Sequence, residues 1–263
     1  MTTHATQWDR SERLRGTVAL VTGASSGIGE ATAQALAAHG ATLALVARRA
    51  DRLDSLATDI RRGGGEALVV AADVADRSAA EGAIARVADA LGRIDIVINN
   101  AGVMLLGPVA TSTVDDWERM LNVNLHGALY VAHAALPHLL KAAADGPRRV
   151  ADLINVSSVA GRLVRLGSGV YSATKHGLGA FSESLRQEVG GKFVRVALVE
   201  PGSTATELRS HNRPEVVEAI KARLGPIEVL QPRDIAESIC HIVTRPRHVA
   251  INELLIRPSE QVT

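Results

Sequence analysis

Short apolar stretches alternate along the chain with longer segments in which apolar residues recur at every third or fourth position. The short stretches predict strands, and the periodic segments between them predict helices. Strands are expected at 17–21, 42–46, 67–72, 94–98 and 249–256, with two more centred near Leu153 and Val196. Since these stretches are apolar almost throughout, helices should cover both faces of a parallel sheet. The pattern therefore predicts an α/β fold of the Rossmann type, a doubly wound seven-stranded sheet in the order 3-2-1-4-5-6-7.

The alternation continues over nearly the whole chain of 263 residues, a length that suits one large domain. We expect that domain to span 15–263, with residues 1–14 as an N-terminal extension. The alternation breaks at 203–231, where Pro214 and Pro226 flank a short helical pattern. A long excursion at the carboxyl end of a strand is either a solvated insert or a lid, and its position favours a lid over the substrate.

A glycine-rich turn separates the first predicted strand from an alanine-rich helical segment at 30–38. Its glycines, Gly23, Gly27 and Gly29, follow a Gly-x3-Gly-x-Gly spacing. Glycines allow the backbone to turn tightly and approach a pyrophosphate, and the amino end of the following helix attracts its charge. The turn predicts a dinucleotide site, although a glycine-rich loop taken alone can equally be an ordinary turn.

Polar residues at the ends of the next strands refine this expectation. Arg48 and Arg49 follow the second strand, where a protein that binds NAD usually has Asp or Glu for the ribose hydroxyl. Two guanidinium groups suit the 2′-phosphate of NADP instead; the alternative is a basic start to a solvent-exposed helix. Asp73 and the segment 99–102 end the third and fourth strands, at the edge where open parallel sheets bind ligands.

Candidate catalytic chemistry lies further along the chain, at Ser158, Tyr171 and Lys175. Tyr171 and Lys175 are four positions apart in a stretch with helical periodicity, so they should share one face of a helix. A cation beside a phenol favours the phenolate, which would lower the pKa of Tyr171 from about 10 and allow it to pass a proton to a substrate oxygen. Taken alone, such a pair is more often a solvent-exposed helix pair.

Together, these motifs resemble the short-chain dehydrogenase/reductase family from about Leu14 onward. The matching segments are 22–29, 73–74, 99–102, 122–125, 157–161, 171–175 and 201–206. The resemblance implies an oxidoreductase that transfers hydride between NADP(H) and a carbonyl or alcohol carbon of a small molecule. It also implies that Tyr171 is the general acid and base, that Lys175 lowers its pKa and holds the nicotinamide ribose, that Ser158 binds the substrate oxygen, and that Asn124 belongs to a water relay.

The same resemblance implies a larger set of cofactor-binding residues. They are Gly23, Ser25, Ser26, Gly27, Ile28, Gly29, Arg48, Arg49, Asp73, Val74, Asn100, Ala101, Gly102, Tyr171, Lys175, Pro201, Gly202, Thr204 and Thr206. Two rival functions stay open: a dehydratase or epimerase on the same fold, and a non-catalytic NADP-binding regulator. The first would usually alter the Tyr171 and Lys175 arrangement, and the second has no need of Ser158 as well, so the intact set favours the hydride-transfer enzyme.

Three further segments, 104–109, 181–189 and 256–262, resemble the clavulanic acid dehydrogenases of this family and its NADP-dependent 3-hydroxy acid dehydrogenases. The former reduce an aldehyde that bears a carboxylate, so we expect an acid group on the substrate. Arg162 and Arg165 follow Ser158 in a loop that should border the site, and they are expected to bind that group. The alternative is that both arginines are solvent-exposed or part of a subunit contact.

Composition excludes other classes of function. Lys and Arg total 29 against 28 for Asp and Glu, so the net charge of +1 offers no reason to expect a nucleic acid or a membrane as partner. No apolar run reaches the roughly 18 to 20 residues of a membrane span, and the polar start lacks the apolar core of a signal peptide. A cytoplasmic protein is therefore predicted.

Single residues and helices complete the expectations. Cys240 is the only cysteine and is expected to be a packing residue, and His133 and His138 are poorly spaced for a metal, so no metal site is predicted. Two long helices, expected at about 114–140 and 169–189, resemble those through which members of the family form homotetramers.

Overall fold

The computed structural model describes residues 13–262, so residues 1–12 of the expected N-terminal extension lie outside it. Leu14 is fully buried in the core, and its backbone N–H donates to the carbonyl of His39 at 2.9 Å. The packed domain therefore includes Leu14. Its sheet consists of β1 (Val18–Thr22), β2 (Thr42–Ala47), β3 (Ala67–Ala71), β4 (Ile96–Asn99), β5 (Ala151–Val156), β6 (Val194–Pro201) and β7 (Glu253–Ile256).

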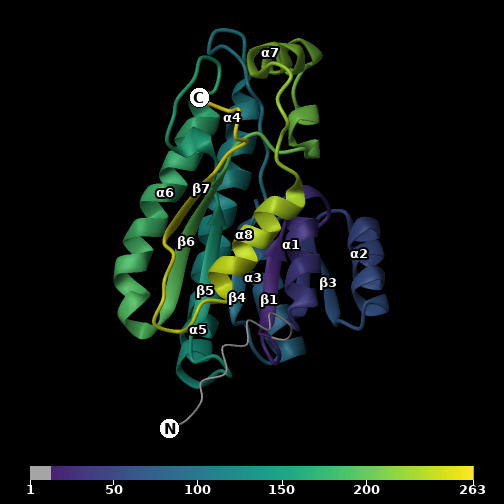
Figure 1. Ribbon diagram of the computed structural model, residues 1–263, viewed down its shortest axis with the longest axis vertical. Coiled ribbons are helices and arrows are strands. Elements are labelled where there is room, and N and C mark those ends of the chain that lie inside the picture. The colour runs from purple at the N-terminus through teal and green to yellow at the C-terminus, as the bar shows by residue number, and fades with distance from the viewer. Residues whose placement is uncertain (1–12, 263) are drawn as a thin grey trace.

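All neighbouring strands are parallel, and the order β3-β2-β1-β4-β5-β6-β7 confirms the predicted topology. One face of the sheet is covered by α1 (Gly27–Ala38), α2 (Ala50–Arg62) and α8 (Pro232–Val243), and the other by α3 (Arg77–Leu91), α5 (Gly127–Asp145) and α6 (Gly169–Val189), as Figure 1 shows. Each layer of helices packs on its own cluster of buried apolar side chains. The central strands β1, β4, β5 and β6 are buried along their length, because helices cover both of their faces, whereas the edge strands β3 and β7 are partly exposed.

The last strand is shorter than expected. β7 begins at Glu253 and pairs with the carboxyl half of β6, whereas the apolar pattern predicted a strand from residue 249. The carbonyl of Val249 instead accepts a hydrogen bond from the Arg195 guanidinium at 2.8 Å. A side chain thus takes the place of a ladder partner, which the apolar pattern does not reveal.

The helical stretch expected at 114–140 consists of three parts. α4 (Val114–Met120) leads into a π-helical turn, η1 (Leu121–His126), and then into α5. A π-helical turn inserts one extra residue and often marks a functional position. Here it carries Asn124, one of the predicted site residues.

The irregular segments gather at the carboxyl end of the sheet (Figure 1). They are the loop 100–113 after β4, the loop after β5 with the short helix η2 (Val159–Gly161), and the segment after β6 with η4 (Glu207–His211) and α7 (Pro214–Leu224). A further short helix, η3 (Gly190–Lys192), follows α6 at the opposite end. Over residues 13–262, no helix combines the length and the apolar character that a membrane span requires.

Candidate active site

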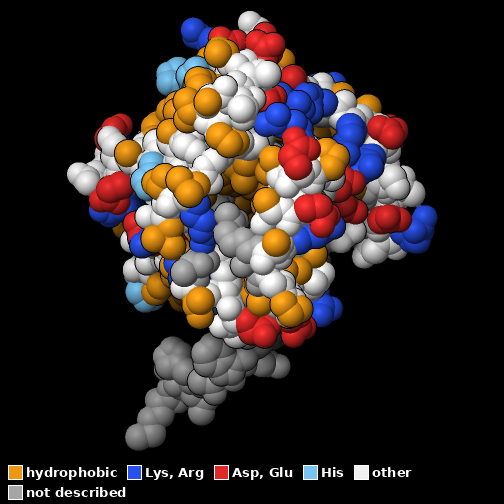
Figure 2. Space-filling view, turned by 90° about the horizontal axis from the view of Figure 1, so that it is seen from above, with side chains coloured by type: hydrophobic (Ala, Val, Ile, Leu, Met, Phe, Trp, Pro, Cys, Tyr) orange, Lys and Arg blue, Asp and Glu red, His pale blue; other side chains and the backbone are white. Residues whose placement is uncertain are grey.

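A cavity of about 390 Å³ opens at the carboxyl ends of the strands. In Figure 2, hydrophobic side chains gather on one side of this hollow, and charged side chains gather on the other. Cavities of this size usually hold a small molecule. Most of the predicted site residues line it, namely Gly23, Ser25, Ser26, Gly27, Ile28, Arg48, Arg49, Asp73, Val74, Asn100, Ala101, Gly102, Ser158, Arg165, Tyr171, Lys175, Pro201, Gly202, Thr204 and Thr206. Gly29, Asn124 and Arg162 do not.

The glycine turn between β1 and α1 is tightly packed. Gly23 has a φ of +65°, a left-handed conformation that favours glycine. A Cβ on Gly29 would lie only 2.4 Å from the carbonyl oxygen of Gly23, so Gly29 is needed for packing although it does not face the cavity. The amide of Asn100 donates to the carbonyls of Thr22 at 3.0 Å and Gly23 at 3.3 Å. The turn thereby places the amino end of α1 at the cavity, where it suits a pyrophosphate.

Two arginines border this turn at the start of α2. The Nε of Arg49 donates to Ser25 Oγ at 3.1 Å, and its Nη2 donates to Ser25 Oγ at 3.0 Å and Ser26 Oγ at 2.8 Å. Arg48 Nη1 lies 3.7 Å from Asp73 Oδ2. Both guanidiniums are partly exposed and line the cavity. They are therefore placed where the phosphate of a phosphorylated ribose could bind beside the glycine turn.

The three candidate catalytic residues meet at the inner end of the cavity. Tyr171 and Lys175 lie on one face of α6 and are 6% and 5% exposed. Ser158 caps η2 by accepting from the N–H of Ala160 at 3.1 Å, and its hydroxyl acts to lower the pKa of the Tyr171 phenol. Lys175 Nζ donates to the carbonyl of Val156 at 2.8 Å. The strand end and the helix thus bring a hydroxyl, a phenol and an amine to one place.

Burial sets the protonation of this group. It raises the pKa of Tyr171 above the usual 10, while the hydrogen bond with Ser158 acts in the opposite direction. Burial also lowers the pKa of Lys175 to about 8. The expected lowering of the Tyr171 pKa by Lys175 is therefore wrong for this geometry, because Nζ lies 6.0 Å from the ring centroid and desolvation of the phenol outweighs its attraction. Tyr171 stays protonated at neutral pH, as a proton donor must.

Asn124 does not line the cavity but lies behind its wall, where it binds the loop after β4. Its Oδ1 accepts from the N–H of Val103 at 2.8 Å, and its Nδ2 donates to the carbonyl of Val103 at 2.9 Å and to Thr174 at 3.3 Å. A Cβ on Gly102 would lie 3.4 Å from Asn124 Oδ1 and 3.9 Å from Lys175 Nζ, so the three residues are close. Asn124 fixes the loop after β4 beside Lys175, and its place in a water relay stays a prediction.

The two arginines expected to bind an acid group lie in different surroundings. Arg162 donates from Nε to Glu200 Oε2 at 2.6 Å and from Nη2 to Glu253, and it does not reach the cavity. Burial raises the pKa of Glu200, and the Arg162 hydrogen bond opposes that rise. Arg165 does line the cavity. Because two carboxylates already bind Arg162, only Arg165 is placed to meet a substrate.

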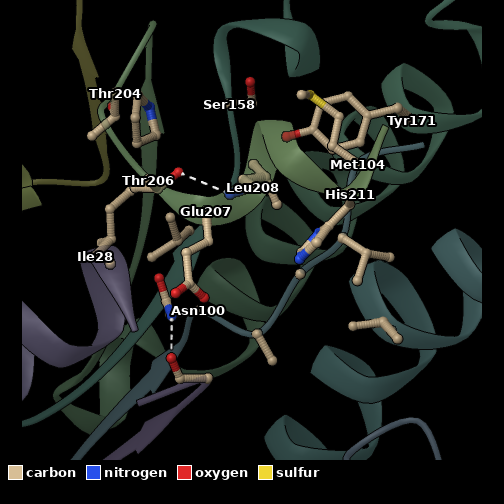
Figure 3. A pocket seen from close by; sticks show the side chains of 18 of the residues that line it. Ile28, Asn100, Met104, Ser158, Tyr171, Thr204, Thr206, Glu207, Leu208 and His211 are labelled. Atoms are coloured by element: carbon tan, nitrogen blue, oxygen red, sulfur yellow. Dashed lines mark hydrogen bonds between the residues drawn. The ribbon is translucent and has the colours of Figure 1, made fainter. Parts of the chain in front are cut away.

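The segment after β6 supplies wall residues that the sequence did not single out. Leu208 and His211 line the same cavity as Tyr171 and Met104, and Figure 3 shows them below these two side chains. Burial, together with nearby arginines, lowers the pKa of His211 below 6.5. The broken helical rhythm identified the segment, but nothing local indicated which of its side chains face inward. Among residues 13–262, no cluster of three or more His, Cys, Asp or Glu could hold a metal ion.

Comparisons with known proteins place this arrangement among dehydrogenases. The family model described as short chain dehydrogenase matches residues 17–217. The glycine betaine reductase ATRR of Emericella nidulans is 41% identical over 94% of this chain, which spans only 19% of that reductase. An uncharacterized oxidoreductase of Staphylococcus aureus is 36% identical over 92% of this chain and 96% of its own length.

Two solved structures extend the likeness to cofactor complexes. A serine dehydrogenase in its closed form, complexed with NADP+, has a TM-score of 0.85 at 32% identity and covers 94% of this chain and 97% of its own. An alcohol dehydrogenase from the archaeon Thermococcus sibiricus, complexed with 5-hydroxy-NADP, has a TM-score of 0.81 at 28% identity and covers 94% and 98%.

Proposed function

This chain belongs to the short-chain dehydrogenase family and is an oxidoreductase of that family, and we propose that it transfers hydride between NADP(H) and a carbonyl or alcohol carbon. One observation carries the proposal. Ser158, Tyr171 and Lys175 converge in a cavity that also contains the glycine turn. A hydride-transfer site needs a proton donor beside the cofactor site, and this cavity offers both.

The chain's own residues manage the proton. When bound, the nicotinamide supplies or accepts the hydride. In reduction, Tyr171 gives its proton to the substrate oxygen as the carbonyl carbon gains the hydride, and in oxidation the phenolate takes the proton back. The Ser158 hydroxyl donates a hydrogen bond to the same oxygen and stabilises its developing charge. Lys175 lies one helical turn away and would bind the nicotinamide ribose.

The choice of NADP(H) rests on Arg48 and Arg49. Both guanidiniums line the cavity beside the glycine turn, with Ser25 and Ser26 adjacent. Planar guanidiniums bind a phosphate through paired hydrogen bonds, which a ribose hydroxyl cannot match. The serine dehydrogenase and the archaeal alcohol dehydrogenase were solved with NADP+ and 5-hydroxy-NADP, which agrees with this choice.

The substrate is proposed to be an aldehyde or ketone, with a carboxylate bound by Arg165. Apolar side chains such as Met104 and Leu208 form much of the wall near Tyr171, and Arg165 brings a positive charge to it. The resemblance to clavulanic acid dehydrogenases stays a prediction, and a 3-hydroxy acid dehydrogenase is the alternative. Segment 203–231 would serve as the lid, because Thr204, Leu208 and Ile220 from it border the cavity. A homotetramer in the cytoplasm also stays a prediction.

Steady-state oxidation of NADPH and NADH with a panel of aldehydes and ketones tests the proposal. We expect turnover with NADPH and a clear preference over NADH; no turnover with any carbonyl compound would favour a regulator or a different reaction. The panel includes a carboxylate-bearing aldehyde and its methyl ester. A desolvated arginine is worth about 1.5 to 3 kcal/mol to a carboxylate, so Arg165→Leu should reduce efficiency with the acid roughly 10-fold to 150-fold and leave the ester unaffected.

The matched control for that substitution is Arg62→Leu, which removes an exposed arginine at the far end of α2. If the unmodified protein reduces the acid and the ester with equal efficiency, the substrate does not need a carboxylate and that part of the proposal is wrong. The NADP(H) assignment would stand on its own measurement.

A further inference from the structure

One carboxylate of the segment after β6 reaches across to the nucleotide side of the cavity. Glu207, the first residue of η4, accepts from Arg49 Nη1 at 3.0 Å through Oε2 and from Arg52 Nη1 at 2.6 Å through Oε1. Both arginines lie at the start of α2, about 155 residues earlier in the chain. Glu207 therefore joins the expected lid to the expected phosphate site.

Glu207 presents its two oxygens to two guanidiniums, as a phosphate would. Arg49 already donates from Nε and Nη2 to Ser25 and Ser26, and Glu207 takes its remaining nitrogen, Nη1. These ion pairs hold the pKa of Glu207 at about 2, so the group is an anion at neutral pH. A built-in anion thus occupies a donor that the 2′-phosphate of NADP would use.

We propose that Glu207 is a specificity-determining residue that competes with the cofactor's 2′-phosphate for Arg49. The inference rests on the proposed use of NADP(H). Two anions bound to the same guanidinium repel each other, so binding of the phosphate disfavours the contact of the Glu207 carboxylate with Arg49 Nη1. A dinucleotide without that phosphate leaves the Arg49 to Glu207 pair intact.

Arg52 moderates this competition. Because it binds the other oxygen of Glu207, it keeps the displaced carboxylate near α2 and lowers the cost of giving up Arg49. Arg52 does not line the cavity, so it acts through Glu207 and is a positioning residue. The same short helix carries Leu208 and His211 toward Tyr171, so the phosphate site and the substrate wall share one element.

Binding of 2′,5′-ADP and 5′-ADP, measured by calorimetry, tests the proposal without the nicotinamide. The unmodified protein should prefer 2′,5′-ADP. Glu207→Gln, which keeps the size of the side chain and removes its charge, should tighten 2′,5′-ADP about 3-fold to 10-fold and change 5′-ADP less than about 2-fold. Glu81→Gln is the matched control, because Glu81 forms an exposed 2.8 Å pair with Arg77 on α3; it should change neither affinity.

A double-mutant cycle separates the role of Arg52. Arg52→Leu should weaken 2′,5′-ADP about 2-fold to 5-fold in the unmodified background and have no effect in the Glu207→Gln background. Weakening in both backgrounds would mean that Arg52 binds the phosphate directly, which overturns the positioning role.

Other outcomes are equally decisive. Weaker binding of 2′,5′-ADP by Glu207→Gln would show that Glu207 orients the arginines, and unchanged binding would show no competition; either result overturns the inference. If the unmodified protein binds the two nucleotides equally well, the NADP(H) assignment itself fails, a separate and distinguishable result.

Discussion

The two ends of the sheet bury charged groups in opposite ways. At the amino ends of the strands, Asp95 accepts from both nitrogens of the Arg93 fork at 2.7 Å and from the backbone of β1 at 2.9 Å. Beside it, Asp152 accepts from Arg195 at 2.7 and 3.0 Å and from Arg148 at 2.6 Å. Each carboxylate is fully buried, and each has at least three donors.

At the carboxyl ends of the strands, the buried polar groups have few hydrogen-bond partners to offset their loss of contact with water. Lys175 has one carbonyl partner, that of Val156, and desolvation alone accounts for its lowered pKa. Tyr171 has the Ser158 hydroxyl and is otherwise desolvated. A buried carboxylate with several donors avoids the cost of an unpaired charge, so losing a partner there destabilises the fold, whereas groups left short of partners keep the perturbed pKa values that chemistry uses. We infer that the amino end is built for stability and the carboxyl end for reactivity.

The largest expected effect is that of Tyr171→Phe on turnover. The change keeps the ring and removes the proton, so turnover should fall by about 10² to 10⁴-fold while the affinity for NADPH and the free energy of unfolding change little. The chain has one other tyrosine, Tyr130 on α5, and Tyr130→Phe is the matched control. Retention of more than about a tenth of the turnover, where chemistry limits the rate, would refute the assigned role.

A substitution at the amino end of the sheet, Asp152→Asn, should lower the stability of the fold and leave turnover nearly unchanged. Asp152→Asn leaves the buried Arg195 without its counter-charge, so the free energy of unfolding should fall by about 3 to 5 kcal/mol, measured by urea denaturation. Turnover per folded molecule should stay within about 2-fold. Asp59→Asn, in an exposed pair with Arg62, should be far milder. If Asp152→Asn lost turnover and kept its stability, the inferred division between a stabilising amino end and a reactive carboxyl end would be wrong.

Features that depend on short spacings along the chain could be predicted from the sequence, whereas contacts between distant positions could not. Strand order and the pairing of Tyr171 with Lys175 depend on periodicity and short spacings, so both could be predicted. Arg162 was expected to bind an acid group of the substrate, but it binds Glu200 and Glu253 instead. These partners are 38 and 91 positions away in the chain. No local pattern encodes such a meeting.

Three further features could not be predicted from the sequence, for related reasons. The π-helical turn at Asn124 adds a single residue to a helix, which the apolar spacing does not resolve. The pairing of Glu207 with Arg49 joins positions 158 residues apart. The expected lowering of the Tyr171 pKa considered only the neighbouring cation, because the extent of burial is a property of the folded chain.

The smallest of the three effects that test this comparison concerns the pH dependence of stability. Below pH 8, Lys175 is protonated in both the folded and the unfolded chain, so the folded state carries the full cost of a buried cation. Between about pH 8 and 10.5 the folded chain loses that proton first, and the cost disappears. A lowering of the pKa from 10.5 to about 8 corresponds to about 3 kcal/mol. The unmodified protein should therefore gain stability over this range relative to Lys175→Met.

The measurement is the difference in unfolding free energy between Lys175→Met and the unmodified protein, taken by urea denaturation at pH 7 and at pH 10.5. Since Met removes the hydrogen bond to Val156 at both pH values, that loss cancels, and the difference should shift in favour of the unmodified protein by up to about 3 kcal/mol. Lys141→Met, at an exposed position of α5, controls for general effects of alkaline pH. A difference that does not move with pH would mean that the Lys175 ammonium is as well compensated as the charges at the amino end.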